Sequence, residues 1–159
     1  MTENTYTITK KVKLANSIYL MDVKAPRVAA SCYPGQFIIL IADEKGERIP
    51  LTICDYDREE GTVTIVFQAL GSSTKLLAEY EVGEAFKDFT GPLGQRSELV
   101  NMPREELSQL KILFVAGGVG TAPVYPQIKW MKENGYEADC IIGARSKELI
   151  ILEDEMRQY

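Results

Sequence analysis

One glycine-rich segment combines residue types that can bind a phosphate group. Residues 114–123 read FVAGGVGTAP, in which an apolar run leads into Gly117, Gly118 and Gly120. Pro123 stands where a helix would begin, so the pattern predicts a strand, a tight turn and a helix. Glycines let the backbone approach a pyrophosphate closely, and the N–H groups at the helix start face its charge. The segment therefore predicts a phosphate-binding turn; the alternative is a strand-to-helix turn that binds nothing.

The spacing within this segment excludes two commoner phosphate motifs. No Lys-Ser or Lys-Thr pair follows the glycines, which excludes the P-loop of nucleoside triphosphatases. Pro123 replaces the third glycine of G-x-G-x-x-G, which excludes the common Rossmann fingerprint. The remaining string, GGxGxAP, is more specific than a glycine-rich turn in general.

A second group of residue types lies at 48–52, which reads RIPLT. An arginine, a proline and a hydroxyl within five residues would suit a flavin nucleotide. They would supply a fixed cation for the diphosphate, a backbone beside the ring and a hydroxyl near the redox-active nitrogen. The alternative is a surface arginine beside a proline at the start of a strand.

A third candidate is the Gly-Ser-Ser-Thr turn at 71–74, which precedes a helical pattern at 75–80. Ser72 or Ser73 is predicted to cap this helix, and the N–H groups at its start could bind a phosphate. The alternative is an ordinary N-cap turn without a ligand.

The elements that would position these motifs are short strands in the first part of the chain. Turn residues separate six predicted strands, at 6–14, 18–24, 36–41, 49–55, 62–69 and 85–89. This regular spacing predicts an antiparallel barrel, and the GPLG sequence at 91–94 is predicted to form an ordered turn at its exit.

The pattern changes to alternating strands and helices in the second part. It predicts a strand at 112–116, a helix at 123–133, a strand at 138–143 and a helix from Leu152. This is the start of a parallel α/β domain. Two strands cannot form a covered parallel sheet, so we expect the chain to be a fragment or a reduced form of a longer protein. The predicted organisation is a barrel at 1–97, a linker at 98–110 and the first part of an α/β domain at 111–159.

The composition excludes several classes of protein. The chain has 159 residues, of which 45% are hydrophobic, and a net charge of −5. These values suit a globular protein and argue against a nucleic-acid partner. No apolar run is long enough to span a membrane, and residues 1–13 lack the apolar core of a signal peptide. We therefore expect no membrane partner and a cytoplasmic location.

The cysteines and the lack of histidine restrict the possible chemistry. Cys32, Cys54 and Cys140 are widely spaced and form no C-x-x-C pair, so neither disulfides nor a metal site is predicted. The sequence contains no histidine, which removes Ser-His-Asp and Cys-His catalysis and the commonest zinc-ligand sets. If the chain is part of an enzyme, a cofactor is expected to perform the chemistry.

Taken together, five motifs resemble the ferredoxin–NADP reductase superfamily. They are PGQF, RIPLT, VFQALGSST, GPLG and AGGVGTAP, and they follow the family order over nearly the whole chain. The branch they resemble most is the electron-transfer subunits of dihydroorotate dehydrogenase, with their relatives in sulfide dehydrogenase and NADH-dependent ferredoxin–NADP oxidoreductase.

The resemblance implies specific residues for two cofactor sites. RIPLT would bind FAD, with the Thr52 hydroxyl near the isoalloxazine ring as the catalytic position. The VFQ backbone would line the flavin, GSST would hold the pyrophosphate, and GGVGT would bind the nicotinamide nucleotide. The implied cofactor-binding residues are Arg48, Pro50, Leu51, Thr52, Val66, Phe67, Gln68, Gly71, Ser73, Thr74, Gly117, Gly118, Val119, Gly120 and Thr121.

Three departures from the family pattern affect these assignments. Ile49 separates Arg48 from the proline, so Arg48 needs a bulge or a loop to face the flavin. Ser73 replaces a family glycine, which requires that this residue avoid positive φ. The family's later strands, its nucleotide-selecting residues and, in this branch, a cysteine cluster for a [2Fe–2S] centre would lie beyond Tyr159.

The resemblance implies an electron-transfer flavoprotein subunit, an FAD-dependent NAD(P)H oxidoreductase component. It would pass electrons between NAD(P)H, FAD and an iron–sulfur centre, a partner oxidoreductase subunit or a ferredoxin. Two alternatives remain: a single-chain flavin reductase, and a non-catalytic module that binds flavin or a partner.

Overall fold

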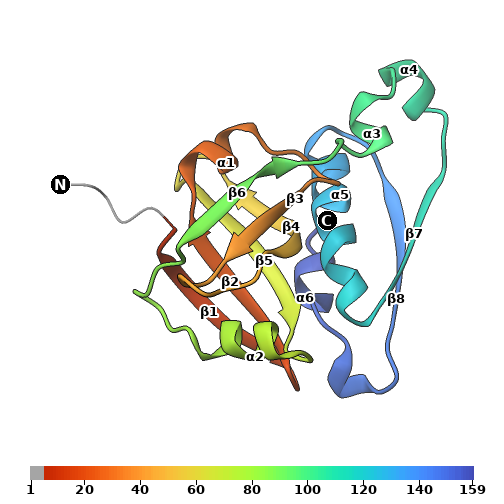
Figure 1. Ribbon diagram of the computed structural model, residues 1–159. Helices are drawn as coiled ribbons and strands as arrows, with labels where there is room; N and C mark the ends of the chain where they lie inside the picture. The colour runs from red at the N-terminus through yellow and green to blue at the C-terminus, as the bar shows by residue number, and fades with distance from the viewer. Residues whose placement is uncertain (1–5) are drawn as a thin grey trace.

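Residues 6–159, which the computed structural model describes, form a curled antiparallel sheet with a smaller α/β layer beside it (Figure 1). The first part contains β1 (Ile8–Ala15), β2 (Ile18–Lys24), α1 (Pro26–Ser31), β3 (Phe37–Ile41), β4 (Ile49–Asp57), β5 (Thr62–Gln68), α2 (Ser72–Glu79) and β6 (Asp88–Leu93). The second part contains α3 (Glu98–Asn101), α4 (Arg104–Leu107), β7 (Ile112–Gly117), α5 (Thr121–Glu133), β8 (Ala138–Gly143) and α6 (Glu153–Met156), with 3-10 turns at Gly118–Gly120 and Lys147–Leu149. Residues 1–5 of the predicted barrel segment lie outside the described residues.

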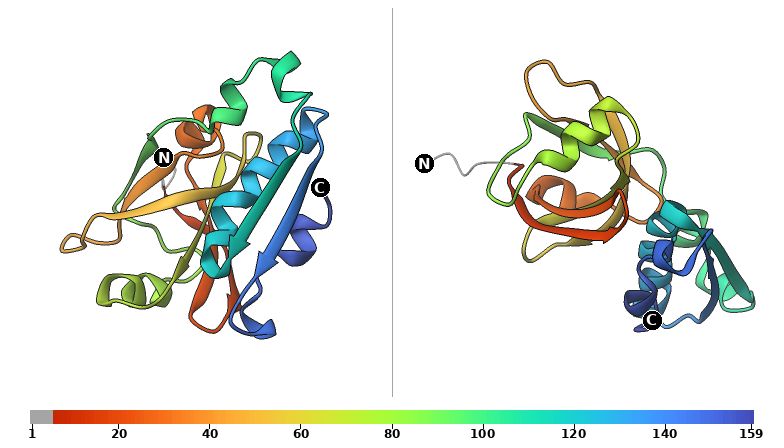
Figure 2. Two further views of the ribbon diagram at one scale, coloured as in Figure 1. Left: turned by 90° about the vertical axis from the view of Figure 1, so that its right-hand side faces the viewer. Right: turned by 90° about the horizontal axis from the view of Figure 1, so that it is seen from below.

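The first part is an antiparallel barrel-like sheet with the strand order β1-β2-β5-β4-β3-β6. The chain before β6 returns to β1, where the Ile8 N–H donates to the Glu84 carbonyl at 2.8 Å. The Phe86 N–H donates to the Tyr6 carbonyl at 3.0 Å in the same contact. The sheet therefore curls until its edges meet (Figure 2). This confirms the predicted fold class, a mostly β chain with an antiparallel barrel followed by an α/β layer.

β5 shows how the strands build two separate apolar clusters. Val63, Ile65 and Phe67 point into the barrel and are at most 2% exposed, as the two-residue period of a strand requires. Val66 points to the opposite face and is buried there by residues of the second part. The barrel therefore has an inner core and a covered outer face.

The last strand of the barrel differs from its predicted position. The prediction of a strand at 85–89 and a turn at 91–94 is wrong, because β6 includes the Gly-Pro-Leu of the second range. Hydrogen bonding to β3 outweighs the turn preference of glycine and proline here. Gly91 is required by close packing, since a Cβ at this position would lie 2.6 Å from Ile38 Cγ2.

The helices also depart in part from the predicted pattern. The strand pattern did not predict α1 or α3, although Pro26 at the first helical position is a signal for α1. Both α3 and α4 lie within the predicted linker at 98–110, where they end at Asn101 and Leu107. The helix predicted at 123–133 begins two residues earlier, at Thr121.

A distant arginine caps α1. The guanidinium of Arg58 donates to the carbonyl oxygens of Ala29 at 3.2 Å and Cys32 at 3.0 Å, and also to that of Ala30. These carbonyls lie at the C-terminal end of the helix, where no intrahelical donor is available and a positive charge is favourable. Arg58 thus ties α1 to the loop that follows β4.

Arg58→Ala is expected to lower the free energy of unfolding by about 1–3 kcal/mol, because these carbonyl oxygens lose a charged donor. Thermal and urea unfolding followed by circular dichroism measure the change. Arg27→Ala is the matched control, since Arg27 is exposed on the same helix and has no ion pair among the described residues. Equal losses in the two variants would contradict the capping role of Arg58.

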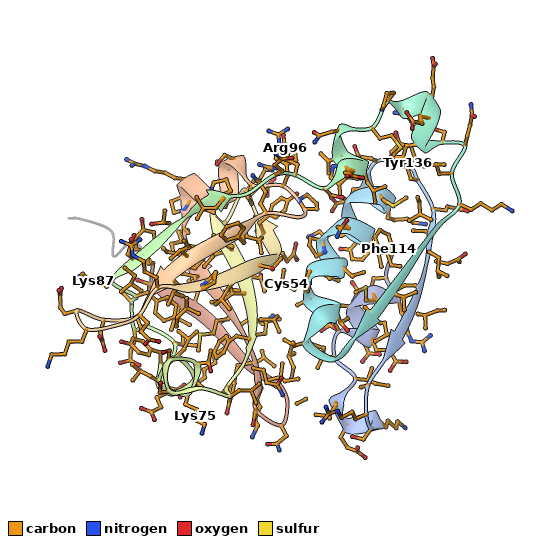
Figure 3. The ribbon with its side chains drawn as sticks, turned by 45° about the vertical axis from the view of Figure 1, so that its right-hand side comes forward. Cys54, Lys75, Lys87, Arg96, Phe114 and Tyr136 are labelled. Atoms are coloured by element: carbon orange, nitrogen blue, oxygen red, sulfur yellow. The ribbon has the colours of Figure 1, made fainter. Side chains whose placement is uncertain are left out.

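The second part packs onto the barrel through α5. β7 and β8 form a parallel pair, and α5 lies between this pair and β4 (Figure 2). Figure 3 shows Cys54 on the barrel side of α5 and Phe114 on the β7 side. The apolar cluster at the junction contains Ile18, Leu20, Cys54, Val66, Ala122, Tyr125, Ile128, Ile151, Leu152 and Met156. α5 is therefore fixed to both parts of the molecule.

Candidate functional site

The outer face of β4 presents Pro50 and Thr52. Leu51 lies opposite the buried Ile38 of β3 and packs on the barrel core, so its side chain points inward. Strand alternation then places Pro50 and Thr52 on the outer face. Thr52 is half-buried, and its hydroxyl has no hydrogen-bond partner within residues 6–159. This hydroxyl is available to a ligand on the outer face.

Arg48 lies in the loop before β4, which begins at Ile49. The side chain of Arg48 is exposed and has no ion pair in the described part of the chain. Because Arg48 precedes the strand, the alternation of β4 does not fix its direction. The inserted Ile49 therefore does not force Arg48 away from the outer face.

The predicted Gly-Ser-Ser-Thr turn forms the start of α2. Gly71 is the N-cap, and its N–H and that of Leu70 donate to the Thr74 hydroxyl at 3.1 Å. The prediction that Ser72 or Ser73 caps this helix is wrong. The hydroxyl that accepts the hydrogen bonds at the helix start belongs to Thr74, which lies within the first turn. Ser73 is helical and avoids positive φ.

The start of α2 faces the β3–β4 loop across a cavity of about 290 Å³. The lining residues are Ala42, Asp43, Lys45, Gly46, Glu47, Ile49, Ser72, Ser73 and Leu76. The helix start offers free N–H groups, and Lys45 offers a cation. A Cβ at Gly71 would meet no atom within 4 Å, so a ligand has room to approach. This donor set fits a diphosphate.

Glu47 opposes an anion at this cavity. Its carboxylate accepts a hydrogen bond from the Ser73 hydroxyl, so the serine is already occupied. A diphosphate would have to displace this contact and would meet a like charge.

Glu47→Gln is therefore expected to tighten FAD binding about fivefold, because it removes one negative charge near the diphosphate. Flavin fluorescence titration at low ionic strength measures the dissociation constant. Glu79→Gln is the control, since Glu79 is exposed at the other end of α2. Unchanged or weaker binding by Glu47→Gln would argue against a diphosphate in this cavity.

The three predicted residues of β5 are placed differently from one another. Phe67 points into the barrel core, and Val66 is buried under the second part. Gln68 is half-buried at the end of the strand, opposite Ile18. Of these three side chains, only that of Gln68 is partly exposed.

The glycine-rich segment forms the predicted strand, turn and helix. Gly117 ends β7, Gly118 to Gly120 form a 3-10 turn, and α5 begins at Thr121. Pro123 is the third residue of the helix, so its predicted place at the helix start is wrong. Gly118 has a φ of +55°, a conformation that favours glycine.

The surroundings of this turn fit a phosphate-containing ligand. A Cβ at Gly118 or Gly120 would meet no atom within 4 Å, which leaves the turn open on its outer side. The Thr121 side chain is fully buried, and its hydroxyl has no hydrogen-bond partner within residues 6–159. An unpaired buried hydroxyl is costly unless a ligand completes it. Val119 packs against the apolar junction and anchors the turn.

Residues that the sequence motifs did not indicate lie at the same edge of the sheet. Gly143 ends β8 directly beside Gly117, and the exposed Arg145 and Ser146 follow it. The carboxyl ends of parallel strands meet at one edge, which is where α/β folds bind ligands. The position of Arg145 just after a predicted strand is the signal that could have identified it.

No group of three or more histidine, cysteine, aspartate or glutamate side chains within residues 6–159 could hold a metal ion. No helix in this range is long and apolar enough to cross a membrane.

The chain is similar to several known proteins, although no family model matches it. It is 56% identical to an uncharacterised protein from Clostridium beijerinckii, covering 96% of this chain and 52% of that protein. It is 38% identical to a homologue of the electron transfer subunit of dihydroorotate dehydrogenase B from Thermotoga maritima, covering 95% and 51%. The solved NADH-dependent reduced ferredoxin–NADP oxidoreductase superposes with a TM-score of 0.84 and 35% identity, covering 99% of this chain and 55% of that one. The chain spans about half the length of the relatives it matches.

Proposed function

Because the chain belongs to the ferredoxin–NADP reductase superfamily, we propose that it is the FAD-binding and nucleotide-binding part of an electron-transfer flavoprotein subunit. Its electron donor is NAD(P)H, and the whole protein is an FAD-dependent oxidoreductase component. The observation that carries this proposal is the packing of α5 on β4. That contact joins the helix behind the glycine turn to the strand with the RIPLT motif.

The residues of the chain bind and orient the two cofactors. Arg48 and the start of α2 would hold the diphosphate of FAD, and Thr52 would offer its hydroxyl to the flavin ring. The turn around Gly118 and the start of α5 hold the pyrophosphate of NAD(P)H. When bound, FAD would supply the redox chemistry that links two-electron and one-electron transfer. No side chain is needed as a general base.

The organisation and partners of the whole protein are part of this proposal. We assign the FAD-binding barrel to 1–97, a linker to 98–110 and the nucleotide-binding part to 111–159, in line with the change from antiparallel to parallel pairing. The chain is similar to an electron-transfer subunit homologue and to a ferredoxin–NADP oxidoreductase. This similarity supports a partner oxidoreductase subunit or a ferredoxin as electron acceptor. The [2Fe–2S] centre is proposed for polypeptide outside this chain. A cytoplasmic location stays a prediction from the sequence.

Flavin titration tests the proposed function directly. The purified chain is expected to quench FAD fluorescence with a stoichiometry of one, and to bind FMN at least tenfold more weakly because FMN lacks the second phosphate. Equal affinity for the two flavins would remove the diphosphate site from the proposal. No binding of either flavin would remove the proposal itself.

Thr52→Val is expected to shift the flavin reduction potential while changing FAD affinity less than threefold. The substitution keeps the side-chain shape and removes the hydroxyl that can hydrogen-bond the ring. Spectroelectrochemistry of the loaded protein measures the potential. Thr62→Val, in β5 at the far end from the site, is the control. An unchanged potential with strongly reduced FAD binding would mean that Thr52 has only a structural role.

A further inference from the structure

An ion pair bridges the junction between the barrel and α5. The Lys129 Nζ lies 2.9 Å and 3.2 Å from the two carboxylate oxygens of Asp55. The side chains are 23% and 25% exposed, so water screens the pair less than it screens a surface contact. Burial alone would lower the pKa of Lys129, but the hydrogen bond and the charge of Asp55 outweigh it and raise this pKa. The charged pair is therefore maintained at the junction.

A β-bulge in β4 makes this contact possible. Ile53 lies opposite Ile65 and Asp55 lies opposite Thr64, so Cys54 is an extra residue in the pairing. The bulge turns two consecutive side chains to the outer face. Cys54 enters the apolar cluster at 1% exposure, and Asp55 reaches the ion pair at the edge of that cluster. A regular strand would turn one of these side chains into the barrel.

β4 and α5 run in the same direction along their contact. A cavity of about 190 Å³ is lined by Asp55, Tyr56 and Arg58 from the β4 side and by Pro126, Lys129, Trp130 and Glu133 from α5. The later residues of the strand thus lie beside the later residues of the helix. Followed back toward their starts, both elements lead to the candidate site.

The ion pair lies at a similar distance from Thr52 on β4 and from Thr121 at the start of α5. Thr52 precedes Asp55 by about 10 Å along the strand. Thr121 precedes Lys129 by about 12 Å along the helix. Apolar packing is non-directional and does not by itself fix how far a helix slides along a strand. A charge-assisted hydrogen bond is directional and does fix it.

We propose that Asp55 and Lys129 form a positioning latch that sets the register of α5 on β4. Through α5, the latch fixes where the turn at Gly118 lies relative to the outer face of β4. The step from register to hydride transfer rests on the proposed function, because correct register would hold the nicotinamide against the flavin. The structural step, from ion pair to register, does not depend on any cofactor.

Hydrogen exchange of the protein without flavin tests the structural step. In Lys129→Met, which keeps the apolar stem and removes the charge, amides of α5 and β7 are expected to exchange about fivefold faster. Barrel amides are expected to be unchanged. Asp55→Asn, which keeps the shape of the carboxylate, is the second variant and is expected to behave in the same way. Reversing the pair with Asp55→Lys and Lys129→Asp is expected to restore slow exchange.

Lys132→Met is the matched control, since Lys132 is exposed on the same helix and has no ion pair within residues 6–159. If the amides of α5 exchange at the same rate in Lys129→Met as in Lys132→Met, the latch is overturned. Faster exchange in the barrel as well as in α5, or no rescue by the reversed pair, would show a merely structural contribution and would also overturn it.

Flavin reduction by NAD(P)H tests the step to function. With FAD bound, Lys129→Met is expected to lower the limiting rate about tenfold without changing the FAD dissociation constant, because hydride transfer depends on orientation. A normal limiting rate in a variant with a loosened α5 would overturn the positioning role. If α5 loosens but the full-length protein without the substitution is not reduced by NADH or NADPH, the latch stands and the proposed function fails.

Discussion

Gly118→Val is expected to slow the reduction of bound flavin by NAD(P)H about 100-fold, while FAD binding is retained. Gly118 has a φ of +55°, which is costly for any residue with a Cβ and most costly for a branched one. The added methyl groups would project into the open space where the nucleotide pyrophosphate is proposed to bind. Stopped-flow absorbance at the flavin band, after mixing with NADH or NADPH, measures the rate.

Gly135→Val is the control for Gly118→Val. It introduces similar backbone strain without altering the proposed phosphate site. Gly135 also has a positive φ, +82°, and also has open space around its Cβ position, but it follows the other end of α5. The control is expected to lose stability without losing the limiting rate. Similar reduction rates in Gly118→Val and the unaltered protein would contradict a nucleotide site at the glycine turn.

Arg48→Ala is expected to weaken FAD binding by one to two orders of magnitude, because a charge-assisted contact contributes about 1.5–3 kcal/mol. FMN binding is expected to change less, since the second phosphate of the diphosphate is absent. Arg48 is exposed, so its removal breaks no ion pair among residues 6–159. Fluorescence titration with both flavins, at two salt concentrations, measures the effect.

Lys13→Ala is the matched control for a general loss of positive charge, because Lys13 is exposed on β1. It is expected to leave both flavin affinities unchanged. Equal weakening of FAD and FMN by Arg48→Ala would place this arginine away from the diphosphate and would return it to an ordinary surface role.

Local sequence patterns were sufficient to predict most strands and the strand-turn-helix at the glycines. β2 and β8 have their predicted bounds, because alternating apolar residues and flanking turn residues are short-range signals. The glycine turn was equally predictable, since the need for positive φ at Gly118 is a property of the local backbone.

Long-range pairing decided the features that local patterns did not predict. Gly91 and its neighbours form a strand because β3 supplies hydrogen-bond partners from a distant part of the sequence. At Gly91 a turn preference of less than about 1 kcal/mol competes with several tertiary contacts. The capping of α2 by Thr74 is different, because it is a local contact over three and four residues that the serines at 72 and 73 obscured.

The junction between the two parts was decided by tertiary structure alone. Nothing in the sequence near Cys54 marks an extra residue in the strand pairing, because a bulge is defined by its partner strand. Asp55 and Lys129 are 74 residues apart, and a charge pattern read along the chain cannot pair them. The two candidate motifs could therefore be identified from the sequence. The register that brings them to one face was not, because it depends on contacts between elements that are distant in the chain.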